Sequence, residues 1–176
     1  MTASGVRSVT VTVPAAADMR RLGERLATWL RAGDLVLLTG DLGAGKTTLT
    51  QGIGAGLHVR GDVTSPTFVI AREHRSADGG PDLVHVDAYR LGSLAEVDDL
   101  DLDAAVEASV TVVEWGHGLV ERLADSRLEV RLTRERGGDD ETRTVELAGF
   151  GPRWHDVRLE ALGDRPEPDA ATGVTG

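Results

Sequence analysis

The order of apolar and polar residues along the chain predicts alternating strands and helices. Residues 6–13 alternate valine with polar side chains, which is typical of a strand with one apolar face. Residues 15–30 carry apolar side chains at helical spacing and predict a helix, and residues 48–57 predict a second one. Between them, the apolar run at residues 35–39 predicts a buried strand. This succession is typical of an α/β fold.

The rest of the chain predicts two hairpins and several short elements. Strands at residues 67–73 and 83–87 flank one glycine-rich turn, and strands at residues 128–134 and 142–147 flank another. Because such short connections join antiparallel strands, we expect a mixed sheet and not a purely parallel one. The remaining predicted elements are a strand at residues 110–114 and short helices at residues 94–108, 116–123 and 152–162.

Length and composition indicate one cytoplasmic domain. The 176 residues favour a single domain over residues 1–162, and residues 163–176, rich in Pro, Ala, Gly and Asp, are predicted to be a disordered tail. The chain has no cysteine, which excludes disulfides and thiolate chemistry. No apolar run approaches the roughly 20 residues of a membrane span, and residues 1–13 lack a signal-peptide pattern. The net charge of −10 argues against direct binding of nucleic acid, so any such role would run through a partner.

One segment of the chain carries recognisable chemistry. The sequence GDLGAGKTT, from Gly40 to Thr48, contains a complete G-x-x-x-x-G-K-[ST] loop between a predicted strand and a predicted helix. Lys46 is the only lysine among 19 basic residues, which indicates a position where arginine does not substitute. In such a loop, backbone N–H groups and the lysine bind phosphates while the hydroxyl of Thr47 ligates Mg²⁺. The residues expected to bind the nucleotide are Asp41, Leu42, Gly43, Ala44, Gly45, Lys46, Thr47 and Thr48.

A phosphate loop needs an acidic side chain near its metal ion, and the sequence offers two. Glu114 ends an apolar strand, at the edge where α/β sheets place their ligands. Asp87 ends another predicted strand and could position the attacking water or hold the water shell of the metal. His85 shares the face of Asp87 by strand alternation, although a lone histidine is more often structural. Thr67 lies in a loop that could contact the γ-phosphate in the manner of a switch.

Other features narrow the class of protein. The six acidic residues between Glu96 and Glu107 lack the spacing of an EF-hand, so a solvated helical face is favoured over a metal site, with a protein-docking surface as the alternative. The N-K-x-D and D-x-x-G segments of guanine-nucleotide switches are absent, so we expect an adenine nucleotide. No lid of a small-molecule kinase is evident, although Arg72, Arg75 and Arg90 remain candidate phosphate clamps.

Four segments resemble the TsaE (YjeE) family, the bacterial ATPase required for making threonylcarbamoyl adenosine beside the tRNA anticodon. In chain order they are GDLGAGKTT, SPTF, HVDAYRL and VVEW, and the similarity extends from about Val11 to Trp154. The resemblance implies a P-loop NTPase-like three-layer α/β fold with a mixed central sheet, ATP and Mg²⁺ as cofactors, and slow ATP hydrolysis. It also implies association with the TsaB and TsaD proteins, and contact with tRNA only through that complex.

The same resemblance assigns roles to particular residues. We therefore expect an ATPase that acts on a protein complex. A small-molecule P-loop kinase and a nucleotide-binding regulatory module with incidental hydrolysis are the alternatives. The assigned residues are Lys46 and Asp87 for hydrolysis, Thr47 and Glu114 for Mg²⁺, Thr67 for the switch-like loop, and Trp115 beside the nucleotide or at the partner interface.

Overall fold

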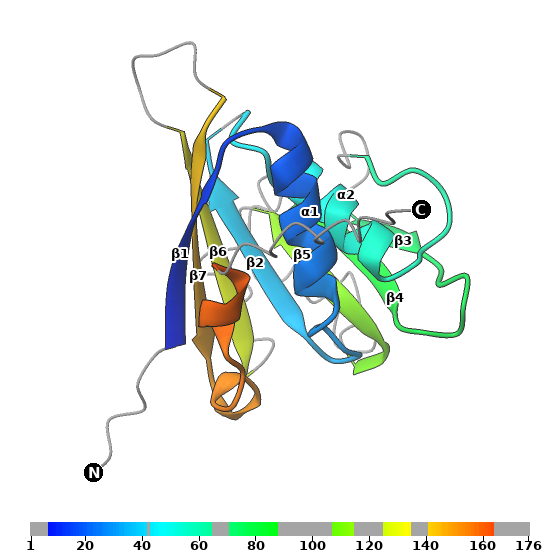
Figure 1. Ribbon diagram of the computed structural model, residues 1–176. Coiled ribbons are helices and arrows are strands. Elements are labelled where there is room, and N and C mark those ends of the chain that lie inside the picture. Colours follow the sequence, from blue (N-terminus) through cyan, green and yellow to red (C-terminus); the bar gives the residue numbers. More distant parts are fainter. Residues whose placement is uncertain are drawn as a thin grey trace, which may run out of the picture.

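The computed structural model describes residues 7–41, 43–64, 71–87, 107–114, 125–134 and 141–163, which form an α/β structure around a seven-stranded sheet (Figure 1). Its strands are β1 (Arg7–Val13), β2 (Leu35–Gly40), β3 (Ala71–His74), β4 (Asp82–Asp87), β5 (Ser109–Glu114), β6 (Arg127–Arg134) and β7 (Arg143–Phe150). The α-helices that lie wholly within these residues are α1 (Ala16–Ala27) and α2 (Lys46–Gly56). In this part of the chain, no helix is long and apolar enough to cross a membrane.

The sheet is mixed, as the two predicted hairpins require. Its strands lie in the order β1-β7-β6-β2-β5-β4-β3. The central strands β6, β2, β5 and β4 run parallel to one another. The predicted hairpins β3–β4 and β6–β7 supply antiparallel pairs, and β1 extends the sheet by pairing antiparallel with β7. The carboxyl ends of four neighbouring strands therefore meet at one edge of the sheet.

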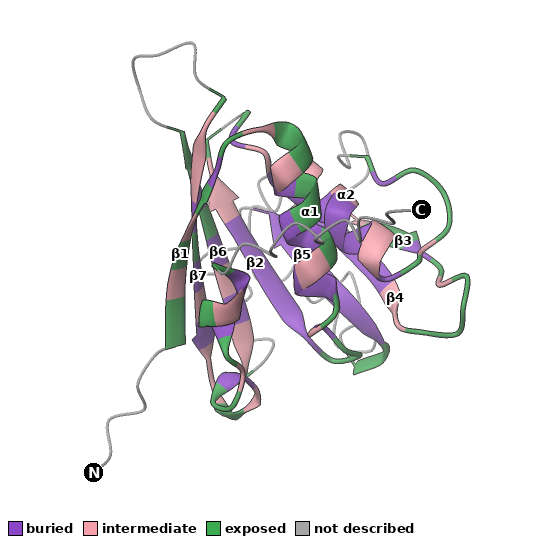
Figure 2. Ribbon diagram, viewed as in Figure 1, coloured by how far each residue is buried: buried purple, intermediate pink, exposed green. Residues whose placement is uncertain are grey.

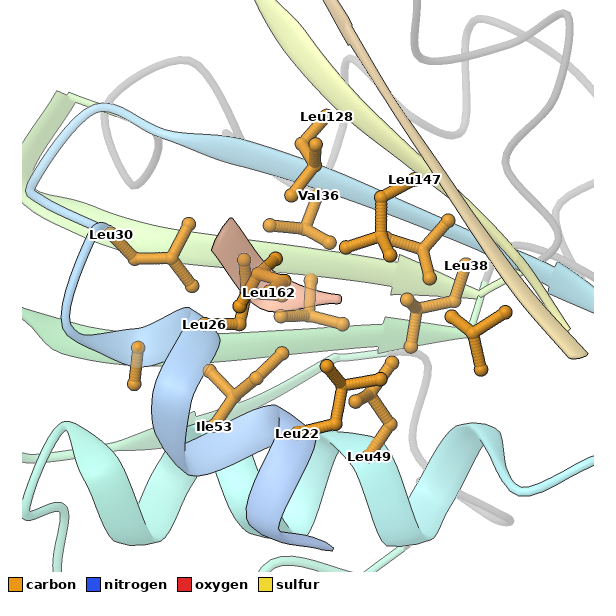
Figure 3. Packing of buried hydrophobic residues seen from close by; sticks show 14 of the residues in the cluster. Leu22, Leu26, Leu30, Val36, Leu38, Leu49, Ile53, Leu128, Leu147 and Leu162 are labelled. Carbon is orange, nitrogen blue, oxygen red and sulfur yellow. The ribbon is translucent and has the colours of Figure 1, made fainter. Parts of the chain in front are cut away.

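Helices α1 and α2 lie side by side against one face of the sheet (Figure 1). The opposite face of β2 is buried too, at Leu35 and Leu37, and Figure 2 shows β2, β4 and β5 buried along most of their length. Strands covered on both faces are the centre of a three-layer α/β fold, in agreement with the predicted class. The layer between helices and sheet is filled by apolar side chains that include Leu22, Leu26, Leu49, Ile53, Val36, Leu38, Leu128 and Leu147 (Figure 3).

Most predicted elements lie where the sequence placed them, with shifted ends. Helix α2 begins at Lys46, two residues before the predicted start, because the helix continues directly from the loop. Helix α1 ends at Ala27, where the next residue, Thr28, donates its hydroxyl to the Arg25 carbonyl oxygen at 2.7 Å. The predicted helix at 116–123, most of the one at 94–108, the first part of the strand at 67–73 and the tail from residue 164 lie outside the described residues.

The prediction of one helix over residues 152–162 is wrong. The structure has two short 3₁₀ helices instead, η2 (Pro152–Trp154) and η3 (Leu159–Leu162). Trp154 and Leu159 are 1% and 0% exposed, respectively, yet residues five positions apart on an α-helix point about 140° away from each other. A continuous helix would therefore expose one of them. The backbone leaves the helical region at Arg158, with φ −83° and ψ 77°, and so both side chains reach the core.

Glycines allow α1 and α2 to pack closely. A Cβ added at Gly52 would lie 2.1 Å from the carbonyl oxygen of Arg20, and one at Gly23 would lie 2.4 Å from that of Leu49. Both neighbours are backbone atoms, which can retreat only if the helices separate. Because α2 begins at the end of the glycine loop, this contact also fixes the position of that loop against α1.

We predict that Gly52→Ala destabilises the protein by about 1–2 kcal/mol. Forcing an extra methyl group into a closed contact typically costs about 1–3 kcal/mol, and the upper part of this range, about 2–3 kcal/mol, applies here because the neighbouring atoms are backbone. The higher helix propensity of alanine returns about 1 kcal/mol. Urea denaturation measures the change. Gly163→Ala is the matched control, since its nearest contacts would be 3.3 and 3.5 Å away and its stability should stay within about 0.5 kcal/mol of the parent. A Gly52→Ala variant as stable as the parent would contradict the close helix contact.

Candidate phosphate-binding site

The loop between β2 and α2 has the backbone shape of a phosphate cradle. Gly43 and Gly45 have φ angles of 78° and 103°, in the left-handed region that favours glycine. Gly45 is also the N-cap of α2, so the helix begins immediately after it. The first N–H groups of a helix have no partner within the helix and carry partial positive charge. The loop and the start of α2 can therefore present several backbone donors to one anion.

Lys46 directs its ammonium group back into this loop. The residue is only 7% exposed, and its Nζ donates to the carbonyl oxygens of Gly40 at 2.7 Å and of Asp41 at 3.1 Å. Burial lowers the pKa of Lys46 from its ordinary value. Three nearby carboxyl groups act in the opposite direction; in decreasing order of effect they belong to Glu114, Asp41 and Asp87. The ammonium is thus close to both of the acidic residues expected at strand ends.

The pairing of the parallel strands explains how these acids reach the loop. Asp87, the last residue of β4, pairs with Glu114, the last residue of β5. Glu114 in turn pairs with Leu38 of β2, two residues before the loop begins at Gly40. Leu38 belongs to the apolar layer beneath the helices, so paired residues on neighbouring strands carry both carboxylates to the face on which α2 begins. Glu114 is 5% exposed, and Asp87 is half-buried.

A buried histidine contacts one of the two acids. Nε2 of His85 on β4 lies 3.0 Å from Oε1 of Glu114, and the side chains are 0% and 6% exposed, respectively. His74 on the edge strand β3 is also buried, and burial is the main cause that lowers its pKa, followed by the influence of His85. Buried polar side chains therefore extend along β4, from His74 opposite Leu83 to Glu114 opposite Asp87.

A hollow of about 150 Å³ adjoins the glycine loop. One wall is apolar and is formed by the turn before α1 and by the first residues of that helix. Another wall carries charged groups at the start of β7. Gly43 to Gly45 and Thr48 form the side that faces the loop. The remaining lining residues are Ala15, Ala16, Met19, Glu141 and Arg143. A flat apolar ring attached to a phosphate chain in the loop would have room here.

The structure brings together most of the predicted site residues that it describes. Asp41, Gly43, Ala44, Gly45, Lys46, Thr47 and Thr48 form the loop and the first turn of α2, and Glu114 and Asp87 lie at the neighbouring strand ends. Leu42, Thr67 and Trp115 lie outside the described residues. Of the three arginines considered as phosphate clamps, Arg72 donates to Thr64 Oγ1 at 2.9 Å and Arg75 lies 3.3 Å from Glu73. Arg90 lies outside the described residues.

The donor set near the loop suits a hard divalent cation bound largely by a phosphate chain. Within the described residues, no group of three or more His, Cys, Asp or Glu side chains is arranged to hold a metal. Mg²⁺ commonly needs only one or two protein oxygens, because phosphates and water supply the rest. The hydroxyl of Thr47 at the start of α2 and the carboxylate of Glu114 are oxygens of that kind.

Comparison with known proteins decides the family. Residues 13–145 match the family described as threonylcarbamoyl adenosine biosynthesis protein TsaE. The chain belongs to the TsaE family. A Streptomyces coelicolor protein named tRNA threonylcarbamoyladenosine biosynthesis protein TsaE is 63% identical over 146 residues, covering 82% of this chain and 99% of its own. A protein of that name from Bacillus subtilis is 38% identical over 138 residues, covering 78% of this chain and 83% of its own.

A solved structure supports the fold of this TsaE-family chain. The crystal structure of YdiB from Bacillus subtilis superposes with a TM-score of 0.69 at 30% identity, covering 90% of this chain and 95% of its own. The family and the α/β class with a mixed sheet, both predicted from the sequence, are therefore confirmed. The bond between His85 and Glu114 and the hollow beside the loop were not predicted. Strand alternation had placed His85 on the face of Asp87, which was the available signal for the first of them.

Proposed function

We propose that this protein binds Mg-ATP, hydrolyses it slowly, and acts on the TsaB–TsaD complex in forming threonylcarbamoyl adenosine next to the tRNA anticodon. The observation that carries the nucleotide part is the buried ammonium of Lys46 at the start of α2, with Glu114 and Asp87 close by. The tRNA part is supported by family membership and by the name of the relatives from Streptomyces coelicolor and Bacillus subtilis.

Each residue of the site has a distinct task in this proposal. The N–H groups of the loop and the ammonium of Lys46 hold the phosphates. Thr47 and Glu114 hold Mg²⁺, which when bound neutralises charge on the phosphate oxygens. The carboxylate of Asp87 orients the attacking water and accepts its proton. The hollow beside the loop receives the adenine ring, with Ala16 on its apolar wall.

Coupling to the partners involves residues beyond this core. Thr67 would contact the γ-phosphate in a loop that ATP orders and hydrolysis releases, which would reset the partner complex for another round. Trp115 follows the metal ligand Glu114 directly and would lie beside the nucleotide or at the partner interface. With a net charge of −10, the chain is expected to meet tRNA only through the complex.

We predict that Mg-ATP stabilises the protein and that Lys46→Ala abolishes this effect. A ligand at about one hundred times its Kd stabilises the folded state by about 2.7 kcal/mol, which raises Tm by roughly 5–10 °C in a chain of this size. GTP should raise Tm markedly less than ATP. Thermal unfolding with each nucleotide makes the measurement. Equal stabilisation by GTP, or an unaltered response of the Lys46→Ala variant, would contradict an adenine nucleotide in this loop.

Thermal unfolding also tests whether the adenine ring binds in the hollow. Ala16→Trp should fill the hollow and reduce the shift given by ATP, while the shift given by inorganic tripolyphosphate stays unchanged because it needs only the loop. Ala17→Trp is the matched control, since Ala17 is also exposed at the start of α1 but does not line the hollow. An ATP shift in Ala16→Trp as large as that of the parent, or one reduced equally in Ala17→Trp, would place the adenine ring elsewhere.

Glu114 and Asp87, the two acids at strand ends, should affect different steps when they are substituted. Glu114→Gln removes a charged metal ligand, so we expect at least a tenfold higher Mg²⁺ requirement for ATP binding, on the order of losses seen at metal sites. Asp87→Asn should still bind Mg-ATP but hydrolyse it about 10²–10⁴ times more slowly, which is the usual contribution of a general base. Mg²⁺ titrations and single-turnover hydrolysis test the pair. If both variants bind Mg-ATP and hydrolyse it like the parent protein, neither residue has the role proposed for it.

If the protein acts on TsaB–TsaD, its ATP hydrolysis should depend on that complex. We expect weak ATP hydrolysis by the isolated chain, clear acceleration by TsaB–TsaD, and negligible tRNA binding at physiological salt. Cells that lack the protein should lose threonylcarbamoyl adenosine from tRNA, and Lys46→Ala should fail to restore it. Phosphoryl transfer to a metabolite at a rate that TsaB–TsaD does not change would indicate a kinase. Full restoration by Lys46→Ala would indicate a scaffold for which nucleotide binding is incidental.

A further inference from the structure

The buried contact between β4 and β5 links a histidine to the acid beside the phosphate loop. His85 is 0% exposed, and its Nε2 lies 3.0 Å from Oε1 of Glu114. In the strand register, His85 is paired with Val112 and Glu114 with Asp87, so the bond runs diagonally between the strands. The Glu114 side chain therefore extends toward His85 and not only toward its paired neighbour.

The bonding partners of the imidazole assign the position of its proton. A carboxylate can only accept hydrogen bonds, so Nε2 of His85 must donate to Glu114. Nδ1 of His85 is buried and has no hydrogen-bond partner among the described residues. A proton on Nδ1 would have no acceptor among the described residues, and an unpaired buried donor costs more than an unpaired acceptor lone pair. A proton on Nε2, shared with Glu114, fits this geometry.

A donor fixed in this way restricts the carboxylate. The last torsion of a glutamate side chain is broad and roughly two-fold, so an unbonded carboxylate samples many orientations. A bond from Nε2 to Oε1 limits the rotation of the Glu114 carboxylate and leaves Oε2 outside that contact. The ring itself cannot move freely, because His85 lies at zero exposure in the interior of the sheet.

The geometry points to His85 as the positioning residue for the Glu114 carboxylate, holding it in the orientation that binds Mg²⁺ at the phosphate loop. This inference rests on the proposed function, in which Glu114 is the metal ligand. His85 does not touch the nucleotide or the metal in this account. Its contribution is to remove a rotational freedom that Mg²⁺ binding would otherwise have to remove.

Two substitutions of similar polarity separate this role from a purely structural one. A glutamine can place an amide N–H near the position of Nε2, whereas an asparagine reaches only the position of Nδ1. His85→Gln should therefore retain the bond to Glu114, and His85→Asn should lose it. His74→Asn is the matched control, because His74 is a buried histidine on the adjacent strand whose Nε2 has no hydrogen-bond partner among the described residues.

The measurement is the Mg²⁺ concentration that gives half of the ATP-dependent rise in Tm. We expect His85→Asn to increase it by about 10–100-fold, the usual effect of losing a residue that supports a metal ligand. His85→Gln should shift it much less, and His74→Asn should leave it unchanged even if it lowers the Tm of the free protein. Stabilisation by ATP in excess EDTA should be the same in all four proteins.

The outcomes distinguish this role from the proposed function. If the ATP-dependent rise in Tm of the parent protein does not depend on Mg²⁺, the assignment of Glu114 as a metal ligand is overturned. The role of His85 is then overturned with it. A normal Mg²⁺ response that His85→Asn leaves intact, or that His74→Asn changes equally, would overturn the role of His85 alone. A measurement without substitution remains decisive if His85→Asn does not fold. Ring ¹⁵N shifts of the unmodified protein should show a proton on Nε2 of His85, and protonation only at Nδ1 would overturn the inference.

Discussion

The candidate site depends on holding one ammonium group where water is largely excluded. A buried charge is costly unless it is paired. Lys46 meets this cost through the carbonyl oxygens of Gly40 and Asp41, at 2.7 and 3.1 Å, and through the carboxyl groups nearby. Those carbonyls belong to the end of β2 and the start of the loop, so the site requires the strand to end at Gly40 and the helix to begin at Lys46. The close packing of α2 on α1 at Gly52 keeps that helix start in place.

The parallel register of the central strands supplies the acidic part of the site. Asp87 and Glu114 are distant in sequence but end neighbouring strands that are paired residue for residue, so their carboxylates emerge on the same face. Glu114 is also connected to the interior by His85. The site therefore combines a loop shaped by local glycine conformation with side chains whose positions come from the sheet. A slip of one residue between β4 and β5 would turn one carboxylate to the other face and dismantle the site while leaving the loop intact.

Sequence alone predicted the parts of this arrangement that local rules control. The glycine loop and Lys46 follow from nine consecutive residues, and the flanking strand and helix follow from the residues on either side. Glu114 and Asp87 follow from their positions at strand ends. What alternation cannot provide is the pairing between strands, so neither the bond from His85 to Glu114 nor the hollow beside the loop could be predicted. The error at residues 152–162 also comes from contacts between distant parts of the chain. Burial of both Trp154 and Leu159 against the sheet overrides the preference for a regular helix.

The balance of charge around the loop explains why metal and nucleotide should bind together. Three carboxyl groups, those of Asp41, Asp87 and Glu114, influence a single ammonium group. A triphosphate that approached without a cation would bring further negative charge close to these acids, and at low effective dielectric such repulsion costs several kcal/mol. Mg²⁺ removes this conflict because its charge lies between the phosphates and the carboxylate that holds it. Under the proposed function, the hydrogen bond from His85 orients the Glu114 carboxylate and leaves its charge to the metal.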